Sequence, residues 1–505
     1  MISIFNFSEF NIWYKPCQRN NQMKIITFLC ILSGSILLSS CNKDLNVVQK
    51  SQITSNSMWT NESDANAAMY GMYNKFRSAF STGYIYWGEY RDGMWGEGLA
   101  SQSDRDNTYL NRLSSSHANS NWGDLYTTIN DCNLILKYTP GIAFSNEANK
   151  NKVLANAYFV RSFCYFWIAR IWGDAPLLLN GFESDKQDDL YPTRQPSSEI
   201  FAQVAKDFNE ALTKMPLSVT DRNLASKASI NMLKADYYLW MSKVRNGGPT
   251  ALQNAKDALA EVKSSSNYLL LSDYSNVFKN KLNQEIIFAW SYVKDEFTGG
   301  YPADYLVPSQ YTSTATIENP VKVGSHQQWC FYTQAYKDFL SSETKDTRTK
   351  VSFDTFYDAP KKQTFQWINK FAGTWESGTR IFNSDIVVYR YADVILFNAE
   401  IENALGNTGI AITELNKIAK RAYGVDNYYP STLSAAEVNN KILNERMKEF
   451  TAEGKIWWDF VRFGVAFIKV PSLVGRETEQ NILLWPVNSA SINGNPNITQ
   501  TPGYL

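Results

Sequence analysis

Apolar side chains recur at helical spacing through the first half of the chain and again through its last third. Between residues 61 and 80, Ala65, Ala68, Met69 and Met72 fall on one face of a helix. The same spacing predicts further helices over residues 122–138, 147–171, 196–216, 227–244, 251–263, 385–405, 408–421 and 434–454. Because short turns with Pro or Gly join many of these segments, the pattern predicts a mainly α protein of stacked helical hairpins.

The helical pattern is interrupted between about residues 265 and 384. Glycine, proline, threonine and aromatic residues alternate there, as in the run from Phe297 to Pro302. The segment holds too many large apolar residues for a linker, so we expect an irregular, loop-rich subdomain that packs on the helices. Residues 41–505 are accordingly predicted to form a single domain.

The N-terminal region has the organisation of an export signal. Lys24 precedes a mostly apolar stretch that ends at Leu38 and is shorter than the roughly 20 apolar residues of a membrane-spanning helix. The sequence Leu38-Ser39-Ser40-Cys41 is similar to a bacterial lipobox, whose cysteine becomes the lipidated first residue of the mature protein. We therefore predict a signal peptide over residues 23–40 and lipidation of Cys41. A plain secretory signal with an incidental cysteine is the alternative.

Residues 1–22 do not have the organisation of a signal peptide. We therefore predict that translation starts at Met23 and that residues 1–22 are an upstream extension. The remaining mature cysteines are Cys132, Cys164 and Cys330, an odd and widely spaced set once Cys41 is lipidated. That set does not form a disulfide framework.

The composition excludes several function classes. Lys and Arg total 49 and so do Asp and Glu, so the chain has no basic field to hold nucleic acid. The two histidines, His117 and His326, have no metal-binding spacing. No phosphate loop, nucleophile elbow, CxxC motif or EF-type loop occurs, and we predict no cofactor and no metal.

Aromatic residues crowd into two glycine-rich segments outside the predicted helices, around residues 84–95 and 292–305, and Trp329 follows later. Flat rings beside Asp, Asn, Gln and Arg suit a sugar, which offers C–H faces to stack on and hydroxyls to hydrogen-bond. The predicted ligand-binding residues are Tyr90, Arg91, Trp95, Tyr301, Tyr305 and Trp329. The alternative is that these rings pack the loops onto the helices.

Two carboxylates lie on one face of the predicted helix after Ser434. Glu445 and Glu449 continue the apolar stripe of Val438 and Ile442, so both are expected to be half-buried. A pair of acids could serve glycoside hydrolysis. Buried carboxylates more commonly need cationic partners, and a structural ion-pair network is the favoured interpretation. The candidate partners are Arg390, Arg421, Arg446 and Arg462.

Several motifs occur in order along the chain. The C-terminal one runs from Asn444 to Lys455 and continues with Trp458-Asp459 and Arg462-Phe463-Gly464. The others are Trp122-x-x-x-Tyr126-x-x-Ile129-x-x-Cys132-Asn133, Arg161-Ser162-Phe163 through Trp172-Gly173-Asp174-Ala175-Pro176-Leu177, Arg390-Tyr391-Ala392-Asp393-Val394 with Ala399-Glu400, Leu484-Trp485-Pro486-Val487, and Gln500-Thr501-Pro502-Gly503-Tyr504. With the lipobox, this ordered set resembles the SusD/RagB family of nutrient-binding surface lipoproteins of Bacteroidota. Asp393 replaces the usual Glu, and Thr501 replaces the usual Asn.

The resemblance implies a frame of tetratricopeptide-like helical hairpins with an irregular loop-rich part. It also implies a partner, a SusC-type TonB-dependent β-barrel transporter over which such a lipoprotein acts as a hinged lid, and an oligosaccharide or other nutrient as ligand. Lys43-Asp44, just after Cys41, resembles the short charged signal that sends such lipoproteins to the cell surface. The expected location is therefore the outer membrane, through the lipid anchor and facing the cell exterior.

Three hypotheses for the function follow. The first is a non-catalytic receptor that captures a glycan on aromatic side chains and delivers it to the transporter. The second is an all-helical glycosidase or lyase. The third is a structural subunit of the transporter whose aromatic residues contact the barrel and no ligand.

Overall fold

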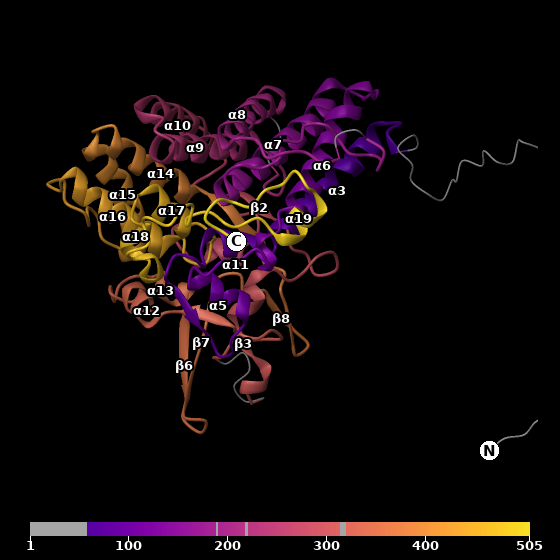
Figure 1. The fold of residues 1–505 in the computed structure, drawn as a ribbon. Helices are drawn as coiled ribbons and strands as arrows, with labels where there is room; N and C mark the ends of the chain where they lie inside the picture. Colours follow the sequence, from indigo (N-terminus) through magenta and orange to yellow (C-terminus); the bar gives the residue numbers. More distant parts are fainter. Residues whose placement is uncertain (1–57, 188–189, 218–220, 314–319) are drawn as a thin grey trace, which may run out of the picture. The chain divides into compact units, whose positions relative to one another are not determined.

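Antiparallel helices form the first half of the described chain. The computed structural model describes residues 58–187, 190–217, 221–313 and 320–505, and residues 58–505 belong to one unit. Each long helix of this half packs on the next one along the chain (Figure 1). They are α3 (Glu62–Phe80), α6 (Gly123–Tyr138), α7 (Glu147–Trp172), α8 (Ser197–Lys214), α9 (Lys227–Val244) and α10 (Gly248–Lys263). The shorter α4 (Gly83–Gly88) and α5 (Ser103–Tyr109) lie between α3 and α6 in sequence.

A second set of helices forms the last third of the chain. It consists of α14 (Tyr391–Ala404), α15 (Thr408–Tyr423), α16 (Ala435–Glu449), α17 (Ile456–Arg462), α18 (Ala466–Lys469) and α19 (Ser489–Gly494). Helix α14 contacts α9 and α10 and thereby joins the two sets. The predicted capping box of α16 is confirmed, because the Ser434 hydroxyl accepts from the Glu437 N–H at 3.3 Å and the Glu437 carboxylate accepts from the Ser434 N–H at 2.8 Å.

The segment between the two sets contains only short elements in its described residues. Its helices are α11 (Asn276–Lys279), α12 (Gln334–Leu340) and α13 (Thr349–Ser352). Its strands are β2 (Ile286–Trp290), β3 (Val307–Pro308), β4 (Val323–Gly324), β5 (Cys330–Tyr332), β6 (Asp354–Asp358), β7 (Gln363–Trp367), β8 (Thr374–Glu376) and β9 (Thr379–Ile381). Strands β3, β6, β7 and β8 lie away from α8 and α10 (Figure 1). The mainly helical fold with an irregular part agrees with the prediction.

Strands pair only two at a time among the described residues. The antiparallel pairs are β2 with β10 (Ile386–Arg390), β6 with β7, β8 with β9, and β5 with β1 (Trp95–Glu97), while β3 and β4 are parallel. Two of these pairs, β1–β5 and β2–β10, join segments from different regions of the sequence. They therefore fasten the loop-rich part to the rest of the chain.

The two largest errors in the predicted helix boundaries lie at β10 and after α16. The helix expected from residue 385 begins at Tyr391, because Ile386–Arg390, which starts with three β-branched residues, forms a strand that pairs with β2. The helix expected to stop at Gly454 ends at Glu449. In the segment after Glu449, Ala452 and Gly454 adopt positive φ angles of 60° and 68°, which fold the chain back into a turn.

Aromatic side chains from both halves meet in the main core. Phe80 of α3 stacks on Trp290 of β2 at 5.0 Å between ring centroids, and Phe163 of α7 meets Phe76 edge-on at 5.2 Å. Cys132, Cys164 and Cys330 are buried free thiols. Burial in this core explains the high aromatic content of the helical segments.

The predicted start at Met23, the signal peptide and the lipidated Cys41 lie outside the described residues. Within the described part, no helix combines the length and apolar character that crossing a bilayer requires.

Candidate functional site

Four of the six predicted ligand-binding residues form a buried aromatic stack. Tyr90, Trp95, Tyr301 and Tyr305 are each no more than 2% exposed. Trp95 stacks on Tyr305 with 5.3 Å between ring centroids, and Tyr90 meets Trp95 edge-on at 4.9 Å. Tyr301 lies 5.7 Å from Tyr305 at the other end of the stack. The expectation that these rings expose their faces to a ligand is therefore wrong.

Backbone pairing explains why this aromatic loop folds inward. Gly93 has a φ of 79°, and the Asp92 carboxylate accepts from the Met94 N–H at 2.7 Å, so the chain turns sharply before β1. Strand β1 then pairs with β5, with Trp95 opposite Tyr332. The turn and the pairing together bring the rings onto the core, where burying each large side chain contributes about 1.5–3 kcal/mol.

Arg91 is also buried and acts as a structural cation. Its guanidinium donates to the backbone carbonyls of Ile482 at 2.6 Å and Leu483 at 2.9 Å, and to the Asn111 side chain at 2.8 Å. It lies 4.3 Å from the centre of the Trp457 ring. Arg91 therefore holds the C-terminal segment in place and is not available to a ligand, which corrects its predicted role.

Trp329 differs from the other five predicted residues because its side chain is only half-buried. One face of its ring packs against the Arg105 guanidinium at 4.2 Å. Arg105 forms an ion pair with Asp304 of the loop-rich part, and the same carboxylate lies 3.5 Å from the half-exposed His326 ring. A hydrogen bond to Asp304 raises the pKa of His326 above its usual value.

Two glutamines accompany this tryptophan: the half-buried Gln327 precedes it by two residues, and the exposed Gln310 pairs with Gln327. Gln310 and Gln327 exchange hydrogen bonds of 3.1 Å and 3.2 Å between their side chains. A primary amide has two N–H donors and two acceptor lone pairs, so each keeps hydrogen-bonding capacity for a polar ligand. We call Trp329, Arg105, His326, Gln310 and Gln327 the Trp329 surface. It combines a partly exposed ring with polar groups of the kind that bind sugar hydroxyls.

The two carboxylates of α16 are buried and paired. Arg348 binds Glu445 at 2.7 Å, and Arg390 and Arg421 both bind Glu449. Burial opposes ionisation of Glu449, but the surrounding arginines outweigh it and hold the pKa of Glu449 far below its usual value. Neither carboxylate reaches solvent, and the ion-pair interpretation is confirmed.

The network is larger than the sequence indicated. Two of the predicted partners, Arg446 and Arg462, bind Asp459 instead, and Arg462 also binds Glu400. The sequence pattern did not predict the buried partners Glu285, Arg348, Lys370 and Glu453. The first three lie in or beside the loop-rich part, where no periodicity marks a buried position.

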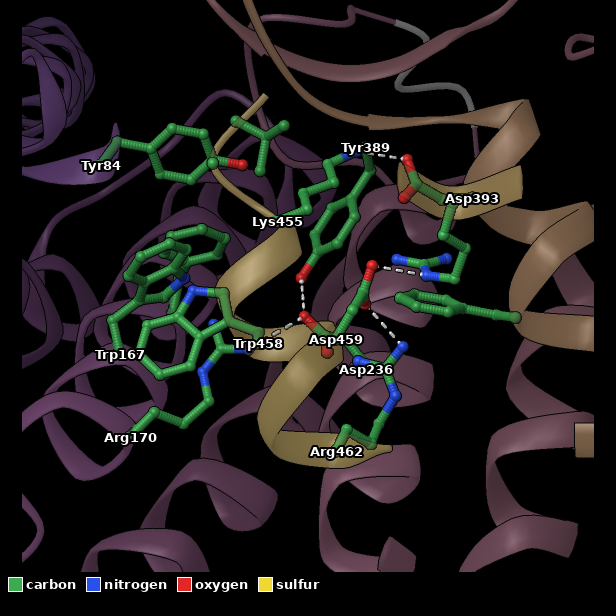
Figure 2. A pocket seen from close by; sticks show the side chains of 15 residues that line it. Tyr84, Trp167, Arg170, Asp236, Tyr389, Asp393, Lys455, Trp458, Asp459 and Arg462 are labelled. Atoms are coloured by element: carbon green, nitrogen blue, oxygen red, sulfur yellow. Dashed lines mark hydrogen bonds and ion pairs between the residues drawn. The ribbon is translucent and has the colours of Figure 1, made fainter. Parts of the chain in front are cut away.

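An internal cavity borders this network. Arg170, Asp236, Asp459 and Arg462 are among the residues that line it (Figure 2). Its volume of about 30 Å³ is close to that of one water molecule in the liquid, so it is too small for a sugar. In the described residues no group of three or more His, Cys, Asp or Glu side chains is arranged to hold a metal ion.

Comparison with known proteins settles the family. Residues 281–504 match the model of the SusD family, and residues 46–239 match the model described as starch-binding associating with outer membrane. The chain belongs to the SusD/RagB family. The SusD-like protein P38 of Formosa agariphila is 27% identical to this chain, and the alignment covers 95% of this chain and 98% of that protein.

Solved SusD superfamily structures share the fold. One from Bacteroides fragilis is 28% identical, with a TM-score of 0.76, and covers 88% of this chain and 100% of its own. One from Bacteroides vulgatus is 27% identical, with a TM-score of 0.77 and the same coverage. Membership of the SusD/RagB family places the chain among proteins known for starch or glycan binding at the outer membrane.

The turn that follows α16 in this SusD/RagB protein rests on one buried acid. The Glu89 carboxylate accepts from the N–H groups of Ala452 at 2.6 Å and Gly454 at 2.7 Å. Burial raises the pKa of Glu89 to about 8, although the two N–H donors and the nearby Lys370 act in the opposite direction. Glu453, which also faces Glu89, adds to the increase.

This shift predicts a pH-dependent stability. Between the usual carboxyl pKa of about 4.5 and about 8, the folded state keeps a proton on Glu89 that the unfolded state releases. The free energy of unfolding contributed by this group therefore falls as the pH rises. Between pH 5 and pH 8, the free energy of unfolding of the wild-type protein is expected to fall by on the order of a few kcal/mol more than that of Glu89→Gln. Urea denaturation of both proteins measures this difference. Parallel pH profiles of the two proteins would contradict this assignment.

Proposed function

We propose that the protein is a non-catalytic lipoprotein of the outer membrane, facing the cell exterior, that binds a glycan and passes it to a SusC-type TonB-dependent transporter. Family membership, the lipobox at Cys41 and the surface signal Lys43-Asp44 support the location. Tyr90, Arg91, Trp95, Tyr301 and Tyr305 are buried, so the ligand contact is assigned to the Trp329 surface.

The observation that carries this assignment is the environment of Trp329. Arg105 covers one face of the ring, and Asp304 compensates the charge of Arg105. The cation therefore fixes the ring without presenting an unpaired charge. A rigid ring beside amides and a histidine can stack on the C–H face of a sugar while the polar groups bind its hydroxyls.

Replacing Trp329 with Ala is expected to weaken glycan binding at least tenfold, which corresponds to about 1.4 kcal/mol of lost binding free energy. The expected change in melting temperature is small because the ring is only half-buried. The measurement is isothermal titration of purified protein with glycans selected on an array. Trp375→Ala provides a control at another half-buried tryptophan of the loop-rich part.

Three outcomes would contradict parts of the proposal. Unchanged glycan affinity in Trp329→Ala would remove the Trp329 surface as the site. Release of reducing ends from a polysaccharide would indicate a glycosidase. Co-purification with a β-barrel, together with no binding to any carbohydrate or peptide, would favour a structural subunit whose aromatic residues contact the barrel.

A further inference from the structure

Helices α6, α7 and α8 line a polar pocket that shares no residue with the Trp329 surface. The pocket has a volume of about 680 Å³, and the segment 179–181 also lines it. Such a volume lies within the range of ligand pockets, which is about 300–1,000 Å³. We call it the α6–α8 pocket. The residues on which the argument depends are Lys137, Tyr158, Arg161, Lys206, Glu210 and Lys214.

The floor of the α6–α8 pocket is rigid. Arg161 binds Asp207 through two parallel hydrogen bonds of 2.8 Å and 2.7 Å, and both side chains are more than nine-tenths buried. The Asn133 side chain accepts a third bond from Arg161 at 2.8 Å, and Gln203 donates to Asp207 at 2.7 Å. Arginine has five N–H groups, and these bonds use three of them. Two N–H groups of a fixed, buried cation therefore remain for an acceptor.

The charges around the pocket leave a positive excess. Asp207 compensates Arg161, and Glu183 forms an ion pair with Lys137. Lys206 and Lys214 have no carboxylate within 4 Å among the described residues, and Glu210 lies one helical turn from each of them. Among the described residues, the pocket lining together with Glu183 carries four positive and three negative charges, whereas the whole chain is neutral. This local excess favours a ligand with an anionic group.

An aromatic ring completes the set of contacts. Tyr158 is half-buried, lines the pocket and lies 5.5 Å from the Arg161 guanidinium. A ring beside cations and hydrogen-bond donors suits a sugar that carries a carboxylate, because the ring can stack on the sugar while the cations bind the acid.

We propose that the α6–α8 pocket binds a carboxylate-bearing sugar residue, and is a second glycan site distinct from the Trp329 surface. The sugar carboxylate binds above Arg161, where Lys206 and Lys214 supply positive charge, and the sugar ring packs on Tyr158. The inference rests on the proposed function in one respect, that the ligand of this protein is a glycan.

The test is titration of the full-length protein, purified in detergent, with trigalacturonate and with the neutral maltotriose. Trigalacturonate is expected to bind wild-type protein, and Lys206→Ala combined with Lys214→Ala is expected to weaken that binding at least tenfold. Tyr158→Ala is expected to weaken it in the same direction. The matched control combines Lys243→Ala with Lys469→Ala, two exposed lysines outside the pocket, and is expected to leave the affinity unchanged. Raising the salt concentration should weaken binding, since screening acts on exposed charge pairs.

The outcomes separate this inference from the proposed function. If trigalacturonate binding is lost in Trp329→Ala and kept in the lysine variant, the acidic sugar uses the Trp329 surface and the second site is wrong. Binding of neutral glycans without any binding of trigalacturonate would overturn the second site and leave the proposed function intact. If hexaglutamate binds more tightly than trigalacturonate and this binding is lost in the lysine variant, the ligand of the pocket is an acidic peptide and not an acidic sugar. No binding of any glycan would contradict both proposals.

Discussion

Replacing Arg390 with Met is expected to lower the free energy of unfolding by about 3–5 kcal/mol, or to prevent folding altogether. Arg390 is fully buried and binds three carboxylates, those of Glu285, Glu449 and Glu453. Methionine fills a similar volume but supplies no charge. Three buried acids would then share the remaining cations, and unpaired buried charge is very costly.

The effect can be measured by urea denaturation, with an exposed ion pair as control. Lys420 binds Asp426 where both side chains are more than half exposed, so Lys420→Met is expected to change stability by less than about 1 kcal/mol. Equal stability of Arg390→Met and wild-type protein would show that the buried network is not what holds α14, α16 and the loop-rich part together.

Replacing Trp95 with Ala is expected to cost about 3–5 kcal/mol of stability, because it opens a cavity in the buried stack of Tyr90, Trp95 and Tyr305. Trp95 is 2% exposed, so the substitution removes packing and not a contact surface. Thermal and urea denaturation measure this loss. Trp329→Ala, at a half-buried position, is the matched control and is expected to cost much less.

The same variants distinguish packing from binding. If Trp95→Ala kept the stability of wild-type protein and lost glycan affinity, the ring would be a ligand contact and not a packing residue. The reverse result in Trp329→Ala, large destabilisation without a change in affinity, would make that tryptophan a packing residue.

Periodicity predicted the long helices because their apolar faces repeat along one continuous segment. It failed at Ile386–Arg390, where a β-branched run continues the apolar pattern of the following helix and only its pairing with β2 decides the conformation. Local spacing contains no information about a partner 100 residues away. The end of α16 at Glu449 was missed for a similar reason, since Glu89, from the start of the chain, stabilises the turn that follows.

The aromatic loops show why the candidate site could not be predicted correctly from the sequence. Glycine and polar residues around Tyr90 and Trp95 have the composition of an exposed loop, and composition alone cannot reveal that β1 pairs with β5. The buried cation Arg348 gave no signal because its partners Glu445 and Glu449 lie about 100 residues later. The acids themselves were identified, since they continue a helical stripe that needs cationic partners.

The contacts of Arg91 constrain when the protein can fold. Its guanidinium binds a carbonyl 391 residues further along the chain, and closing so long a loop costs entropy that only the finished contacts repay. The loop around Arg91 therefore reaches its final packing only after the last part of the polypeptide has been synthesised.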